Sequence, residues 1–116
     1  ISYPAQIDIP SDGNGKIEIT ADFNFSSVED SLSIYVHDES VQTRGDNDEY
    51  FLLKNVADSN QTITMVMDNN YKEYMIGDNG QFTITYKFND SGEPAKRPNG
   101  IYKCTLIMEV ECFIGE

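Results

Sequence analysis

Apolar and polar residues alternate with a period of two along much of this chain. The segments in which every second position is apolar are 16–25, 31–37, 62–67, 81–88 and 101–114. Because successive side chains of a strand point to opposite faces, this alternation predicts strands with one buried and one exposed face. Within 31–37 the apolar positions are Leu32, Ile34 and Val36, and His37 falls on the opposite, polar face. We therefore expect His37 to be a solvated histidine at the end of a strand.

Shorter apolar runs predict further strands at 7–9 and 50–53. Glycine, asparagine and proline are concentrated at 11–15 and 89–100, which predicts loops there because these residues favour turn conformations. The segment 69–80 leaves two alternatives open. Either Asp68 caps a short helix over 71–76 that ends at Gly77, or the segment is a strand with Tyr71, Glu73 and Met75 on one side.

Seven or eight short strands separated by turn signals, with no long helical pattern, predict an all-β fold. The architecture that fits this spacing is an antiparallel β-sandwich, and a closed antiparallel barrel is the alternative. No repeat or linker divides the chain, so residues 1–116 are expected to form a single domain.

Composition supports a sheet protein and restricts its partners. The chain has 12 Ile and 6 Val but 4 Leu and 4 Ala, a balance that favours strands over helices. The net charge of −12 opposes a phosphate backbone, so a nucleic-acid partner is not expected. No apolar run approaches the length of about 18 residues that a membrane-spanning helix needs, so no membrane span is expected.

The two cysteines, Cys104 and Cys112, fall on the same face of the last predicted strand. In a continuous strand they would lie about 26 Å apart at ~3.3 Å per residue. A disulfide requires Cα atoms within about 7 Å. We therefore expect two reduced, buried thiols.

Two short motifs at the ends of the chain resemble a known class of module. Residues 3–9 read Tyr-Pro-Ala-Gln-Ile-Asp-Ile before a glycine-rich turn, and residues 98–103 read Pro-Asn-Gly-Ile-Tyr-Lys. Both are similar to segments of exported immunoglobulin-like modules of Gram-positive bacteria. The resemblance implies an immunoglobulin-like β-sandwich that is secreted or displayed on the cell surface. It implies no catalytic residue.

The segment 38–49 is about twelve residues long, where hairpin loops usually have two to five, and it is rich in charge. Its candidate binding residues are Asp38, Glu39, Arg44, Asp46, Asp48 and Glu49. Oxygen ligands spaced by two residues suit Ca²⁺, so Asp46, Asp48 and Glu49 are candidate calcium ligands. Since recognition is often located on long loops of rigid sandwiches, we expect this loop to be the functional surface.

Sequence motifs for catalysis are absent: the chain has no GxSxG, HExxH or phosphate-binding glycine loop. We therefore expect a non-enzymatic module with a binding or structural role, with a protein or a cell-surface glycan as partner and no cofactor apart from the candidate calcium. The first alternative is a carbohydrate-binding module in which exposed Tyr35, Tyr71 and Tyr74 stack on sugar rings. The second alternative is a small hydrolase.

Overall fold

The computed structural model describes residues 2, 15–41, 45, 48–89 and 100–115. These residues form eight strands and no helix: β1 (Gly15–Thr20), β2 (Ser31–Asp38), β3 (Tyr50–Asn55), β4 (Thr62–Asp68), β5 (Tyr71–Met75), β6 (Gln81–Phe88), β7 (Tyr102–Lys103) and β8 (Leu106–Phe113). All pairings between them are antiparallel. The predicted all-β antiparallel fold is therefore confirmed, whereas the predicted strand at 7–9 lies outside the described residues.

The strands form two sheets. One sheet has five strands in the order β1-β6-β4-β3-β7, and the other has three strands in the order β5-β2-β8. The sheets curl into half a barrel. No strand pair among the described residues closes a full barrel.

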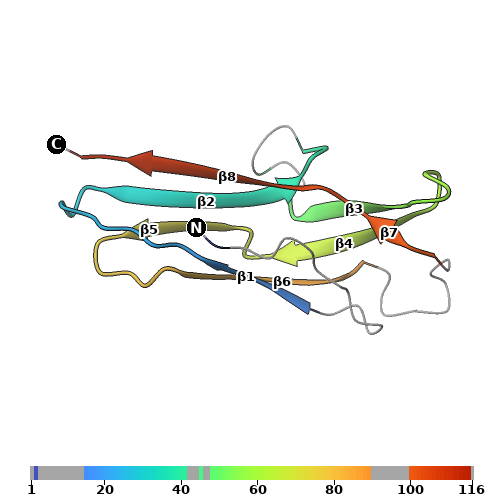
Figure 1. The fold of residues 1–116 in the computed structure, drawn as a ribbon, viewed down its shortest axis with the longest axis horizontal. Helices are drawn as coiled ribbons and strands as arrows, with labels where there is room; N and C mark the ends of the chain where they lie inside the picture. The colour runs from blue at the N-terminus through green and yellow to red at the C-terminus, as the bar shows by residue number, and fades with distance from the viewer. Residues whose placement is uncertain (1, 3–14, 42–44, 46–47, 90–99, 116) are drawn as a thin grey trace.

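In three places, two strands follow each other along the chain and belong to different sheets: β2 and β3, β4 and β5, and β7 and β8. β2 and β3 run end to end along the molecule, as Figure 1 shows, with residues 39–49 inserted between them. On one side the chain of β4 continues into β5, which pairs with β2. On the other side the chain of β7 continues into β8, which also pairs with β2. The loop therefore interrupts the central strand of a long three-stranded ribbon.

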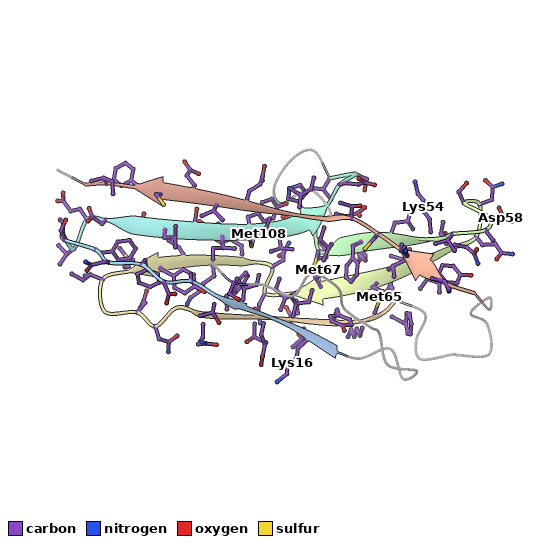
Figure 2. The ribbon with its side chains drawn as sticks, viewed as in Figure 1. Lys16, Lys54, Asp58, Met65, Met67 and Met108 are labelled. Atoms are coloured by element: carbon purple, nitrogen blue, oxygen red, sulfur yellow. The ribbon has the colours of Figure 1, made fainter. Side chains whose placement is uncertain are left out.

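Both sheets contribute to one hydrophobic core. Ile34 of β2, Met65 of β4 and Ile84 of β6 are fully buried within it. Figure 2 labels Met65 and Met67 of β4 and Met108 of β8, all of which pack in this core. The predicted inward positions of 62–67 and 81–88 are thus confirmed. Their period of two is that of a strand with one buried face.

Within the segment 69–80 the chain forms a strand, β5, and not the alternative short helix. Asn69 has a φ of 61°, a left-handed conformation that asparagine adopts more readily than most residues, and the chain turns there from β4 into β5. In β5 the side chain of Tyr74 is fully buried, while Glu73 and Met75 are exposed on the other side. Gly77, with a φ of 91°, belongs to the turn after β5 rather than to a helix end.

Two predicted strands are shorter than expected. Strand β1 ends at Thr20, although Phe23 and Phe25 still pack against the core as the alternation predicted. The predicted strand 101–114 is divided at Cys104 and Thr105, because β7 pairs with β3 and β8 pairs with β2. One continuous strand cannot stay in register with both β2 and β3, because an eleven-residue loop separates those two strands.

A buried carboxylate holds the start of β2 and the end of β8 together. Asp30 accepts hydrogen bonds from the backbone N–H groups of Ser26, Ser27 and Gly115 at 3.0–3.2 Å. Burial alone would raise the pKa of the Asp30 carboxyl, but these hydrogen bonds outweigh burial and hold its pKa below the ordinary value. Asp30 therefore fixes a turn and fastens the C-terminal end of β8.

Candidate functional site

The outward face of the three-stranded sheet carries a group of exposed glutamates. Register places Glu73 of β5 and Glu111 of β8 on either side of Ser33 in the central strand. Glu109 lies two residues before Glu111 in β8, on the same face, and is opposite Tyr35. We call this surface the acidic face and define it by Glu73, Glu109, Glu111, Ser33 and Tyr71.

The acidic face concentrates negative charge, and among the described residues its one ion-pair contact is that of Glu109 with Nε2 of His37, 3.4 Å away. All three glutamates are exposed, and none of the described residues whose register places them on this face is Lys or Arg. Glu73 and Glu111 lie two strands apart, about 10 Å across the sheet. Lys16 and Lys54 belong to the other sheet, and both point away from the molecule (Figure 2). A cation placed over Ser33 would therefore meet carboxylates from two strands.

Apolar side chains border the acidic face at one end. Register places Met75 and Phe113 on either side of Ser31, and they are 46% and 62% exposed. Methionine and aromatic residues are enriched in protein interfaces, where apolar anchors lie beside polar groups. This combination is typical of a surface that binds another protein.

The prediction for His37 is wrong. His37 is only 6% exposed, and its ring stacks on Tyr35 with centroids 4.8 Å apart. Its Nδ1 lies 2.8 Å from the carbonyl oxygen of Asp38, which can only accept, so Nδ1 carries a proton. Its Nε2 lies 3.4 Å from a carboxylate oxygen of Glu109. The histidine therefore links β2 to β8 instead of pointing into solvent.

A loop residue, Asp48, contacts Tyr35 at this end of the sheet. The Tyr35 hydroxyl donates to the carboxylate of Asp48 at 2.8 Å, and the same oxygen accepts from the Gly45 N–H. The side-chain amide of Asn70 donates to the carbonyl oxygens of Val36 and Asp48 at 3.0 and 3.2 Å. The loop is thus fastened to the strand that it interrupts.

The predicted site residues of the loop that the structure describes differ in exposure. Asp38 is 4% exposed, and its carboxylate accepts from the Ser40 hydroxyl. Glu39 is exposed, whereas Asp48 and Glu49 are half-buried. Arg44 and Asp46 lie outside the described residues, so the calcium site at Asp46, Asp48 and Glu49 stays a prediction. Among the described residues, Asp48 already has a structural role as the acceptor for Tyr35 and Gly45.

The expected ring exposure is wrong for two of the three tyrosines. Tyr35 is 7% exposed and Tyr74 is fully buried, while Tyr71 is half-buried. Tyr71 lies on the acidic face, where its hydroxyl donates to Glu73 at 3.3 Å. The three rings therefore do not form the aromatic platform that the sequence suggested.

The two cysteines are free, as predicted, but they differ in exposure. Cys104 is half-buried, and burial together with the nearby carboxylates of Asp38 and Glu39 raises its pKa to about 11. Cys112 is exposed, so the prediction of two buried thiols is wrong for this residue. The reason is that β8 is an edge strand, so Cys112 lies at the rim of the core while Leu32, opposite it on β2, is buried.

The sequence analysis missed the acidic face. Glu109 and Glu111 alternate with Val110 and Cys112, a pattern that marks the polar face of a strand but does not show which strand lies beside it. Glu73 comes from a segment whose secondary structure the sequence left open. Only the pairing of β5, β2 and β8 brings the three glutamates together.

The described residues define an all-β protein of two antiparallel sheets with one acidic sheet face. No family model, no curated protein and no solved structure matches the chain. A helix with the length and hydropathy to cross a membrane does not occur in the described part of the chain.

Proposed function

We propose that this protein is a non-enzymatic, secreted or surface-displayed module that binds a protein partner with basic groups. The observation that carries the proposal is the acidic face, on which Glu73, Glu109 and Glu111 gather from two strands. Opposite charge accelerates association and selects partners, so a basic surface is the complement of this face. Met75 and Phe113 supply apolar contacts at its border.

The proposal includes an immunoglobulin-like β-sandwich as the finer fold class. Two antiparallel sheets that share one core support it, as do the short motifs at the chain ends. In such modules rigid sheets present a face or a set of loops to the partner. Here the loop fastened by Asp48 lies at the border of the acidic face and belongs to the same proposed surface.

A selection from random peptides tests the binding function without a known partner. Phage-displayed peptides are selected on the wild-type protein and counter-selected on a Glu73→Gln, Glu111→Gln double variant. We expect peptides rich in Lys or Arg whose binding weakens with added salt, since screening weakens attraction between exposed charges. Peptides without basic residues, or peptides that bind the variant equally well, would contradict a basic partner.

Two further measurements address location and the alternative functions. Antibodies raised against the protein should label intact cells of the source organism if the module is displayed, and labelling only after lysis would contradict display. On a glycan array, binding that Tyr71→Ala abolishes would replace the protein partner with the carbohydrate-binding alternative. Turnover of chromogenic ester or glycoside substrates would replace it with the hydrolase alternative.

A further inference from the structure

Strand β8 has one paired edge and one open edge. It pairs with β2 from Leu106 to Phe113, and among the described residues no strand pairs with its other side. The Glu39 N–H donates to the carbonyl oxygen of Thr105 at 3.1 Å, which places the odd-numbered residues of this ladder in hydrogen-bonded pairs. By the alternation of an antiparallel ladder, the N–H and C=O groups of Met108, Val110 and Cys112 point away from β2.

The side chains along this open edge are of two kinds. Val110 is 42% exposed and Cys112 is exposed, although the residues opposite them on β2, Ile34 and Leu32, are buried. On the other face, Glu109 and Glu111 point outward as part of the acidic face. The edge therefore offers unpaired backbone groups, an apolar strip on one side and two carboxylates on the other.

We propose that β8 accepts an added strand from a partner protein, and that this strand alternates basic and apolar residues. Backbone hydrogen bonds to β8 would supply affinity, and alternate side chains would supply specificity. The basic residues would lie beside Glu109 and Glu111, and the apolar residues beside Val110 and Cys112. This inference rests on the proposed function and names the partner segment that the acidic face takes.

A second copy of this chain fits the edge poorly. If two β8 strands pair antiparallel about Val110, Glu109 of each strand lies directly opposite Glu111 of the other. Like charges directly opposite each other destabilise a strand pair, and each chain carries a net charge of −12. In this register the same glutamates oppose self-association, whereas they favour a basic strand.

The edge is held in an extended form before any partner arrives. Ser31 pairs with Phe113 at the far end of the ladder, and the Gly115 N–H donates to buried Asp30 at 3.0 Å. His37 and Glu109 link the two strands near the other end of β8. A preorganised edge loses little conformational freedom on binding, which favours affinity.

Amide hydrogen exchange in the free protein tests the premise. We expect the amides of Met108, Val110 and Cys112 to exchange fast and those of Ile107, Glu109 and Glu111 to be protected by β2. Equal protection of both sets would show that the open edge is already covered, and it would overturn the proposal.

The binding test uses an acetylated and amidated nine-residue peptide of alternating Lys and Val. Four control peptides separate the contributions: alternating Glu and Val, alternating Lys and Ser, and two Lys-Val peptides that carry N-methyl groups either on every Lys or on every Val. We expect the Lys-Val peptide to bind and to protect the even-numbered amides of β8. The Glu-Val peptide, the Lys-Ser peptide and the N-methyl peptide that blocks the N–H groups facing β8 should bind about tenfold more weakly or worse. N-methylation in both alternate phases leaves the charges intact, so unchanged binding of both N-methyl peptides would overturn strand addition.

Protein variants distinguish failure of this inference from failure of the proposed function. Val110→Pro removes an N–H that points away from β2, so the β2–β8 ladder stays intact while the added strand loses a bond. We expect it to weaken the Lys-Val peptide about tenfold and Glu111→Gln to weaken it about threefold. Glu73→Gln, two strands from the edge, should change affinity less than Glu111→Gln.

If Glu73→Gln and Glu111→Gln weaken binding equally while Val110→Pro has no effect, the partner lies on the acidic face and strand addition is wrong. If no variant changes binding, both proposals fail. Sedimentation of the protein alone tests self-association. If the wild type is a dimer and Val110→Pro is a monomer, the strand that β8 accepts comes from a second copy and not from a basic partner. If Val110→Pro does not fold, the N-methyl peptides and Glu111→Gln still decide the question.

Discussion

The buried hydroxyl of Tyr74 gives the sharpest prediction about stability. The ring is fully buried between the sheets, with the Phe23 ring 5.3 Å away. Its hydroxyl has no hydrogen-bond partner in the described part of the chain. Burial is also the main cause that raises the pKa of Tyr74. Tyr74→Phe removes this hydroxyl and keeps the ring, so we expect the variant to be more stable than the wild type.

The expected gain follows from two opposing contributions. A buried hydroxyl without a partner costs about 1–3 kcal/mol, because water hydrates it in the unfolded chain. Removing its oxygen also removes a few van der Waals contacts, each of about 0.1–0.2 kcal/mol. We therefore expect a net gain of about 1 kcal/mol. For 116 residues the unfolding entropy near 60 °C is about 0.24 kcal/mol/K, so the Tm should rise by about 4 °C.

A matched control makes the same chemical change on the neighbouring strand. The Tyr35 hydroxyl donates to Asp48 at 2.8 Å, so Tyr35→Phe breaks a bond to a charged acceptor. We expect it to lower stability by about 1–2 kcal/mol. Urea unfolding followed by circular dichroism measures both variants. If Tyr74→Phe is destabilising like its control, the hydroxyl has a partner and the reasoning is wrong.

Three further outcomes are expected. At pH 8 one thiol, Cys112, should react fast with Ellman's reagent and Cys104 slowly, since its raised pKa keeps it protonated; equal rates would contradict the difference in burial. The pKa of Asp30 is lower in the folded than in the unfolded protein, so its contribution to stability is present above the unfolded pKa near 3.8 and is lost as pH falls through the folded pKa. Asp30→Asn should therefore flatten the acid limb of a curve of stability against pH. If the loop binds Ca²⁺, millimolar calcium should raise the Tm and Asp46→Asn should abolish the rise; an unchanged wild-type Tm would refute the calcium site. Asp46 is the cleaner position because Asp48 already accepts from Tyr35.

Most of the fold was predictable because period-two alternation depends only on burial of one face. The inward positions Ile17 and Ile19 of β1, Met65 of β4 and Ile84 of β6 follow this rule, and all four are buried. The strand ends were less predictable. The division between β7 and β8 depends on which strand lies alongside, and the local sequence around Cys104 contains no glycine or proline that marks it.

The acidic face and the buried outward residues were not predictable for the same reason. Tyr35 and His37 occupy the polar face of β2, which the alternation assigns to solvent. The hydroxyl of Tyr35 meets a loop residue thirteen positions away, Asp48, and the ring of His37 stacks on that of Tyr35. Likewise Glu73 and Glu111 are 38 positions apart in the sequence and meet only through β2. Contacts of this kind depend on topology, which a local pattern does not encode.

The interruption between β2 and β3 makes this protein a natural scaffold for grafting. On either side of the loop the chain passes from β4 to β5 and from β7 to β8 in a few residues. The loop ends are fixed by the Glu39 N–H bond to Thr105 and the Met67 N–H bond to Glu49. Lengthening a loop whose ends are already fixed costs little, about 0.6 kcal/mol for each doubling. A foreign peptide can therefore be inserted between Val41 and Asp48 and displayed at the middle of the molecule, while the sheets on either side keep their register.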